Sequence, residues 1–154
     1  MPKCYQLIGV PGSGKSTWIK NQDWANDCAI VSTDNHVEAQ AELEGKTYNE
    51  VFHDFMPFAV KMMARDVELA REAKKDIIWD QTSTSVKSRQ RKFNMLPDYE
   101  HIAVVLATPA ASELMKRLAS RPGKEIPWAV VTGMINNFDM PTEDEGFKEI
   151  WFVS

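Results

Sequence analysis

Short apolar runs alternate with longer amphipathic stretches along this chain of 154 residues. The apolar runs predict strands at residues 4–10, 28–32, 76–80, 101–107 and 148–153. Helical periodicity and helix-start signals predict helices at 15–22, within 36–74, at about 86–95, at 110–120 and at 127–138. Alternation of this kind indicates an α/β fold in three layers, with a central parallel sheet covered on both faces by helices.

The middle segment 36–74 contains an apolar stripe at helical spacing, formed by Phe52, Met56, Ala59, Met63, Val67 and Ala70. Charged residues such as Lys61 and Glu68 fall on the opposite side, so we interpret the stripe as core packing. Pro57 interrupts this segment. Because proline lacks a backbone N–H, we expect it to kink the helix or to begin a second one.

The length of the chain is enough for one hydrophobic core, so we expect residues 1–154 to form a single domain. No apolar run approaches the ~18 residues of a membrane span, and the N-terminus lacks a signal-peptide pattern. These observations predict a cytoplasmic setting and no membrane partner. Cys4 and Cys28 fall in predicted strands without metal-binding or redox spacing, and we interpret both as buried free thiols.

The chain has 18 basic and 22 acidic side chains, which gives a net charge of −4. A protein that coats nucleic acid through bulk electrostatics carries the opposite balance. The composition therefore disfavours that class, although a local basic groove remains compatible with it.

The stretch GVPGSGKST, Gly9 to Thr17, satisfies the phosphate-loop pattern G-x-x-x-x-G-K-[ST] between a predicted strand and a predicted helix. Glycines allow successive backbone N–H groups to converge on a phosphate, and the following helix adds the positive end of its dipole. Lys15 is expected to reach the β- and γ-phosphates, and Ser16 to bind Mg²⁺. Nucleotide binding is assigned to Gly12, Ser13, Gly14, Lys15, Ser16 and Thr17.

Two carboxylates follow predicted strands, where ligands bind in open α/β sheets. Asp80 comes after Ile77, Ile78 and Trp79 and is a candidate acid for holding Mg²⁺ near Ser16. Asp34 follows strand 28–32 and is the candidate base that accepts the proton of an attacking hydroxyl. Each Asp also has a structural alternative, because Asp is a common helix N-cap.

Two arginines, Arg117 and Arg121, lie four residues apart at the end of a predicted helix. Pro122 and Gly123 then break the helix into a short polar loop that could act as a lid. We predict that Arg121 stabilises charge on the transferring phosphoryl group and that both arginines contact the nucleotide. The structural alternative is that both simply complement the C-terminal end of the helix dipole.

A basic cluster follows Thr82 and comprises Lys87, Arg89, Arg91 and Lys92. One interpretation is an acceptor-side contact to a phosphate or a polynucleotide, in which Thr82, Lys87 and Arg89 take part. The other is a solvated helix face.

The stretches IGVPGSGKST, VSTDN, WDQTSTSVKSR, LMKRLASRPGKEIP and MPTEDEGFKEI, taken in order, resemble the 5′-kinase domain of bacteriophage polynucleotide kinase and the small phosphate-loop kinases related to it. The resemblance covers nearly the whole chain. It implies an adenylate-kinase-like P-loop fold, ATP and Mg²⁺ as cofactors, a phage-like origin and a 5′-hydroxyl of DNA or RNA as acceptor. It also implies catalytic roles for Lys15, Asp34 and Arg121, with Asp80 as the supporting acid.

The chain departs from the family pattern at three places. An arginine often stands three residues beyond the base, where this chain has Val37. The usual Asp-x-Thr-Asn is replaced by Asp80, Gln81, Thr82 and Ser83. No D-x-D-x-[TV] phosphatase motif follows, so the resemblance implies a kinase alone.

Three functions remain open from the sequence. The first is transfer of the ATP γ-phosphate to a polynucleotide 5′-hydroxyl. The second is the same chemistry on a nucleoside, a modified base or another small molecule, which the acidic composition and Val37 favour. The third is an ATPase or regulatory nucleotide-binding module, although the chain lacks the D-x-x-G and N-K-x-D sequences of nucleotide switches.

Overall fold

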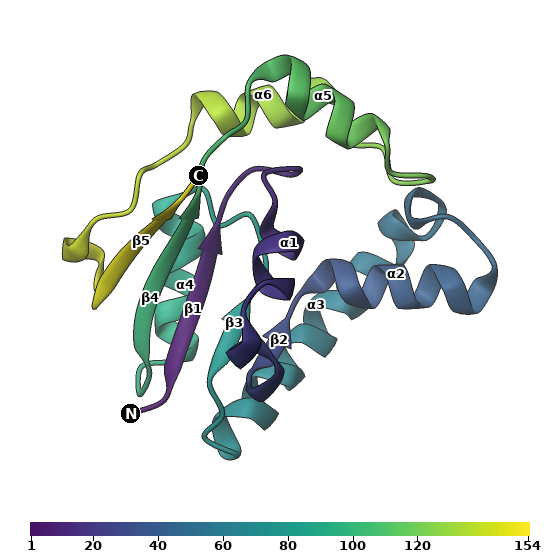
Figure 1. The fold of residues 1–154 in the computed structure, drawn as a ribbon. Coiled ribbons are helices and arrows are strands. Elements are labelled where there is room, and N and C mark those ends of the chain that lie inside the picture. Colours follow the sequence, from purple (N-terminus) through teal and green to yellow (C-terminus); the bar gives the residue numbers. More distant parts are fainter.

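A computed structural model describes residues 1–154 as a five-stranded, all-parallel sheet flanked by helices (Figure 1). The strand order is β2-β3-β1-β4-β5. The strands are β1 (Lys3–Ile8), β2 (Ala29–Val31), β3 (Ile77–Trp79), β4 (Glu100–Leu106) and β5 (Glu149–Val153). The helices are α1 (Lys15–Lys20), α2 (Thr33–Glu44), α3 (Tyr48–Glu72), α4 (Val86–Met95), α5 (Ala111–Ala119) and α6 (Trp128–Asn136), with 3₁₀ turns η1 (Asp23–Asp27) and η2 (Glu143–Glu145). The α/β prediction is confirmed.

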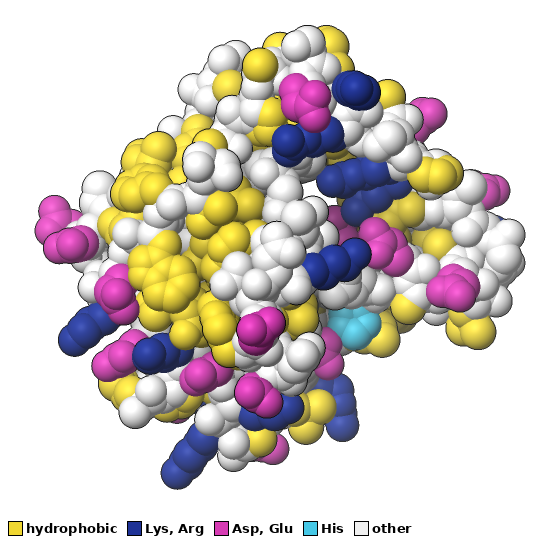
Figure 2. All heavy atoms as spheres, in the orientation of Figure 1, with side chains coloured by type: hydrophobic (Ala, Val, Ile, Leu, Met, Phe, Trp, Pro, Cys, Tyr) yellow, Lys and Arg dark blue, Asp and Glu magenta, His cyan; other side chains and the backbone are white.

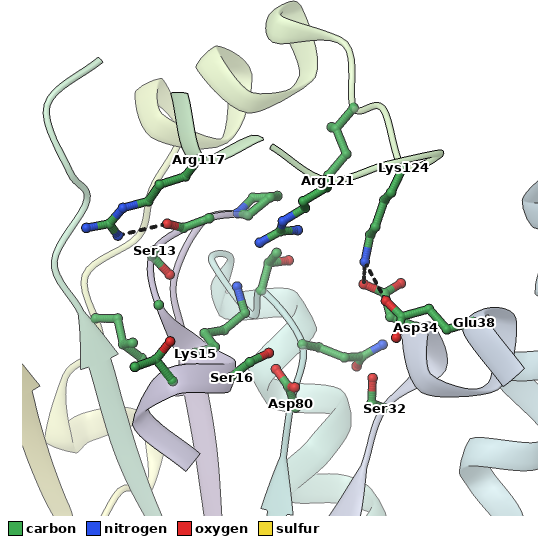
Figure 3. A pocket seen from close by; sticks show the side chains of 18 of the residues that line it. Ser13, Lys15, Ser16, Ser32, Asp34, Glu38, Asp80, Arg117, Arg121 and Lys124 are labelled. Carbon is green, nitrogen blue, oxygen red and sulfur yellow. Dashed lines mark hydrogen bonds and ion pairs between the residues drawn. The ribbon is translucent and has the colours of Figure 1, made fainter. Parts of the chain in front are cut away.

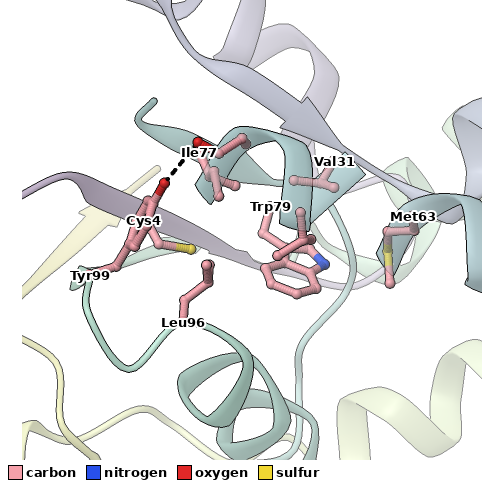
Figure 4. Close-up of a cluster of buried hydrophobic side chains, with 9 residues drawn as sticks. Cys4, Val31, Met63, Ile77, Trp79, Leu96 and Tyr99 are labelled. Carbon is pink, nitrogen blue, oxygen red and sulfur yellow. Dashed lines mark hydrogen bonds between the residues drawn. The ribbon is translucent and has the colours of Figure 1, made fainter. Parts of the chain in front are cut away.

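The core lies on both faces of the sheet, because successive residues of a strand point to opposite sides. On one face, a cluster around Cys4, Ile77 and Trp79 packs against α3 and the end of α4 (Figure 4). On the other face, Tyr5 and Ile78 belong to a second cluster, against which the tryptophans of α1 and η1 pack. The nearly continuous apolar runs of β1, β3 and β4 follow from this two-sided burial.

The break in the middle segment lies earlier than Pro57. Gly45 ends α2 in the left-handed conformation, with φ of 65°. Thr47 then caps α3 through a capping box with Glu50, and the helix continues through Pro57 to Glu72. The prediction that a second helix begins at Pro57 is therefore wrong, because the local cap at Thr47 determines the start and α3 tolerates the missing donor.

Two smaller expectations also change. Cys28 is half-buried and lies between η1 and β2 rather than in a strand, whereas Cys4 is buried in β1 as expected. Phe52 at the start of the apolar stripe is 41% exposed, while Ala59, Met63 and Val67 are buried. No helix of the protein combines the length and the apolar character that crossing a membrane requires.

Candidate functional site

A cavity of about 1270 Å³ opens at the carboxyl ends of β1, β2 and β3 (Figure 3). The segments that line it include the phosphate loop after β1, the start of α2 after β2, the start of α3, the loops after β3 and β4, and the lid loop (residues 120–126) between α5 and α6. Helices α5 and α6 arch over this edge of the sheet (Figure 1). The cavity therefore lies where the topology of an open α/β sheet places ligands.

The phosphate loop connects β1 to α1 in a conformation that requires glycine. Gly12 and Gly14 have φ of 83° and 103°, a region that other residues rarely adopt. A Cβ on Gly12 would also lie 2.9 Å from the Leu114 side chain of α5. The Gly9 N–H donates to the Thr82 carbonyl at 2.9 Å, which fastens the phosphate loop to the loop that follows β3.

Lys15 lies at the start of α1, and its ammonium group turns back into the loop. Its Nζ donates to the carbonyls of Gly9 and Val10, both at 3.0 Å. Burial lowers the pKa of Lys15 to about 8, an effect that the nearby Asp80 carboxylate partly opposes. The amine is thus still mostly protonated at neutral pH. A bound phosphate could therefore accept hydrogen bonds from this ammonium group in place of the two carbonyls.

Asp80 follows β3 and faces Lys15 and Ser16 across the floor of the cavity (Figure 3). Its backbone N–H donates to the Val31 carbonyl at 2.8 Å, so β2 sets its position. Burial raises the pKa of Asp80, and Lys15 opposes that rise. The Ser16 hydroxyl and the Asp80 carboxylate are oxygen donors of the kind that Mg²⁺ prefers. No group of three His, Cys, Asp or Glu side chains forms a self-sufficient metal site, so nucleotide oxygens and water would complete the coordination.

Asp34 lies in the first turn of α2, and it is not the cap of that helix. Ser32 is the N-cap, because its Oγ accepts from the Asn35 N–H at 3.3 Å. The Asp34 carboxylate is instead free to face the cavity. There Oδ1 accepts from the Tyr48 hydroxyl at 2.7 Å, and Oδ2 accepts from Lys124 at 3.1 Å.

The two predicted arginines differ in their contacts with the rest of the protein. Arg117 bonds to Glu113 at 3.0 Å and to the Gly12 carbonyl at 3.1 Å, so it links α5 to the phosphate loop. Arg121 lies in the lid loop, and its side chain points down into the cavity toward Lys15 (Figure 3). Around the opening of the cavity, Lys and Arg side chains lie beside Asp and Glu side chains (Figure 2).

The basic cluster of α4 does not reach this cavity. Arg89 is fully buried, where Glu145 accepts from its Nε at 2.8 Å and the Ser83 carbonyl accepts from its Nη1 at 3.0 Å. The acceptor-side role expected for Arg89 is therefore wrong, and so is the solvated alternative for this residue. Lys92 is also buried, and Lys87 is exposed beside a separate shallow depression. Of the three acceptor-side candidates, Thr82 alone lines the cavity.

Sequence reasoning missed three residues that complete the site: Tyr48, Lys124 and Glu38. Lys124 lies in the lid loop, three residues beyond Arg121, and it contacts both Asp34 and Glu38. Glu38 is one helical turn beyond Asp34, a spacing that places both on one face of α2. Tyr48 carried no signal of its own, since its hydroxyl reaches Asp34 only after α2 and α3 pack together.

Comparison with known proteins agrees with this geometry. A family model described as an AAA domain matches residues 6–141. The chain is 22% identical over 149 residues to the bifunctional polynucleotide phosphatase/kinase of Schizosaccharomyces pombe, a match that covers 94% of this chain and 31% of that protein. The chain thus spans about a third of the length of this relative.

Solved structures share the fold at low sequence identity. A chain of the PezAT chromosomal toxin–antitoxin system of Streptococcus pneumoniae superposes with a TM-score of 0.73 at 18% identity, covering 100% of this chain and 67% of that one. Shikimate kinase from Acinetobacter baumannii superposes with a TM-score of 0.57 at 15% identity, covering 100% and 84%. The likeness establishes a P-loop kinase fold.

Proposed function

Because the chain belongs to the AAA domain family AAA_33 and has the fold of a P-loop kinase, we propose that it transfers the γ-phosphoryl group of Mg-ATP to a hydroxyl acceptor. One observation carries this proposal. Lys15, Asp34 and Arg121 come from three segments that are far apart in the sequence, and all three line the same cavity.

On the donor side, the phosphate loop would hold the β-phosphate with its backbone N–H groups. Lys15 would exchange its bonds to two loop carbonyls for bonds to the β- and γ-phosphates, and Ser16 and Asp80 would hold Mg²⁺ directly or through its water. Mg²⁺ would neutralise charge on the phosphates when bound. Arg121 would stabilise the negative charge of the transferring group, and Arg117 would keep α5 against the loop.

On the acceptor side, Asp34 would receive the proton of the attacking hydroxyl. The acceptor oxygen then forms a bond to the γ-phosphorus while the bond to the β,γ-bridging oxygen breaks, and that oxygen leaves with ADP. The reaction needs little covalent chemistry from the protein. Positioning and charge stabilisation, which the cavity offers from both sides, account for most of the rate in this class of reaction.

We propose a 5′-hydroxyl end of DNA or RNA as the first acceptor. Two similarities support this choice: the S. pombe polynucleotide phosphatase/kinase matches along 94% of the chain, and the five stretches quoted above resemble phage polynucleotide kinases in order. Under this proposal Thr82, at the edge of the cavity, is a candidate acceptor contact.

A small hydroxyl compound is the second candidate, and the charges of the acceptor side favour it. Glu38 and Glu42 of α2 line the cavity beside Asp34, and Val37 is fully buried where related kinases often have an arginine. Lys124, the basic residue closest to Asp34, is already paired with two carboxylates. Carboxylates at these positions repel the phosphates of a polynucleotide more than a neutral acceptor.

Transfer of labelled γ-phosphate from Mg-ATP to a single-stranded oligonucleotide with a 5′-hydroxyl tests the first candidate. The same oligonucleotide with a 5′-phosphate is the matched control. Label on the hydroxyl form alone supports a polynucleotide kinase, and its rate should then fall as salt increases. Absence of label from both forms rejects the first candidate, and a panel of nucleosides and small polyols then tests the second.

A further inference from the structure

The carboxylate of Asp34 is held from two directions. Tyr48, the first residue of α3, donates its hydroxyl to Oδ1 at 2.7 Å, and Lys124 of the lid loop donates to Oδ2 at 3.1 Å. The Lys124 ammonium also lies 4.4 Å from the centre of the Tyr48 ring, within range of a cation–π interaction. Each of these three side chains therefore contacts the other two.

Helix caps position two of the three side chains, Asp34 and Tyr48, independently of the lid loop. The Ser32 cap sets the first turn of α2, which contains Asp34, and the Thr47 capping box sets the first turn of α3, which contains Tyr48. Burial and the hydrogen bond to Asp34 raise the pKa of Tyr48 above its ordinary value, so the hydroxyl remains a donor. Lys124 is the third partner, and it comes from the loop between α5 and α6.

The lid loop is fastened to the same corner of the molecule by backbone groups. The Asn49 N–H donates to the Gly123 carbonyl at 3.0 Å, and its side chain bonds to both the N–H and the carbonyl of Glu125, at 2.9 and 3.1 Å. The loop also carries Arg121, three residues before Lys124. Docking of this one loop thus places one cation above the phosphate loop and another against Asp34.

We propose that Tyr48 and Lys124 are positioning residues for Asp34, and that docking of the lid loop on α2 and α3 is the step that aims this carboxylate at the acceptor. This inference rests on the proposed role of Asp34 as base. Each carboxylate oxygen has two acceptor sites, so Asp34 can accept the acceptor hydroxyl while both partners hold it. Loss of either partner leaves the carboxylate free to rotate and disturbs the geometry of attack.

Kinetics of Lys124→Met and Tyr48→Phe test the positioning role with the acceptor identified by the transfer assay. Both variants keep the size of the side chain and remove its donor. We expect kcat to fall about 10- to 100-fold while the Kd of Mg-ATP stays within about twofold, because the donor side is untouched. Lys124→Arg should recover most of the loss. Lys116→Met removes the same charge from an exposed position on α5, outside the cavity, and should behave as wild type.

Hydrogen exchange of the substrate-free protein tests the docking step without any activity. Lys124→Met should speed exchange at the Glu125 and Asn49 amides, which hold the lid, and leave the amides of β4 unchanged. If these two amides exchange as in wild type and kcat is unchanged, the inference is overturned. A parallel loss of Mg-ATP affinity and kcat also overturns it, since that pattern reports damage to the donor side.

The two experiments separate the inference from the proposed function. Faster exchange at the lid amides in a protein that phosphorylates no hydroxyl acceptor would support the docking contact, and it would reject the kinase proposal together with the role of Asp34. If the protein transfers phosphate to a hydroxyl acceptor and the Lys124 and Tyr48 variants have wild-type kcat and exchange, the kinase proposal is supported and the positioning role is rejected.

Discussion

The two sides of the cavity are built in different ways. The proposed donor side centres on one continuous stretch, Gly9 to Thr17, which contributes backbone groups, Lys15 and hydroxyl side chains, and Asp80 and Arg121 face this stretch from other segments. The acceptor side is assembled from the start of α2, the start of α3 and the lid loop, and it depends on side-chain contacts among Asp34, Tyr48 and Lys124. Backbone recognition suits phosphates, which are the same in every nucleotide. Side-chain recognition can vary with the acceptor, and this explains why a P-loop kinase fold does not by itself identify its second substrate.

The largest expected effect lies on the donor side. Lys15→Ala should lower transfer by a factor on the order of 10³ or more, because no other amine is placed to neutralise the β- and γ-phosphates. The protein should still unfold cooperatively, since Lys15 is only partly buried and belongs to none of the hydrophobic core clusters. Measured kcat and a denaturant unfolding curve check both parts. Full activity in this variant would contradict the assignment of the phosphate loop.

Asp34→Asn is the corresponding change on the acceptor side. It should lower kcat by about 10² to 10⁴ and leave Mg-ATP binding intact, because the amide keeps the shape of the carboxylate but not its basicity. Asp54→Asn, at an exposed position of α3, is the matched control. Isothermal titration with Mg-ATP measures binding on the donor side, and steady-state kinetics measure the loss of kcat on the acceptor side. A near-normal kcat would remove Asp34 from the reaction.

Gly123→Ala probes how closely the lid loop must approach α3. Gly123 has φ of 70°, and an added Cβ would lie 2.6 Å from the Thr47 Cβ. Gly45 has φ of 65° but nothing within 4 Å, so Gly45→Ala carries similar backbone strain without the collision. We expect both to lose about 1 kcal/mol of stability, and Gly123→Ala alone to lower kcat, by about tenfold. Equal kcat values for the two variants would show that close docking of the lid is dispensable.

The last expected effect is on the pH dependence of stability. Burial lowers the pKa of both Lys15 and Lys92 from 10.5 to about 8. Between these values the unfolded chain binds more protons than the native protein, so the free energy of unfolding should rise with pH across this window. Bound Mg-ATP favours charged Lys15 and should remove the contribution of Lys15 to this rise. The contribution of Lys92 should persist with nucleotide bound and should disappear in Lys92→Met.

Denaturant titrations from about pH 7 to about pH 10 measure these changes in the free energy of unfolding, which are at most about 1.4 kcal/mol per pKa unit for each lysine. An identical slope with and without nucleotide would contradict the placement of Lys15 beside the phosphates.

Local signals in the sequence were enough to predict most of the fold. The strand and helix order is confirmed, and α4 begins and ends where its pattern placed it, at residues 86 and 95. The start of α3 was not predicted, because the Thr47 capping box outweighed the expected effect of Pro57. The geometry of the phosphate loop follows from its glycines, which specify the backbone directly.

The acceptor side was harder to predict because it depends on contacts between distant segments. Lys124 and Asp34 are 90 residues apart in the chain, and nothing in the loop sequence indicates which carboxylate the lysine meets. Arg89 illustrates the opposite error. Its neighbours made it look like part of a charged surface, yet Glu145, 56 residues later, lets it be fully buried as an ion pair. Partners of this kind are set by packing, which a local pattern does not contain.

The strand order has a consequence for folding during synthesis on the ribosome. β1 precedes the other four strands of the sheet in the sequence but occupies its centre, between β3 and β4. The phosphate loop that follows it is tied to the Thr82 carbonyl, and the loop containing Thr82 and Ser83 is in turn held through Arg89 by Glu145. The support of the phosphate loop therefore includes Glu145, which lies more than 120 residues beyond it in the sequence. During synthesis the phosphate-loop sequence emerges well before the segment that completes this support, so we expect the loop to reach its final order late in folding.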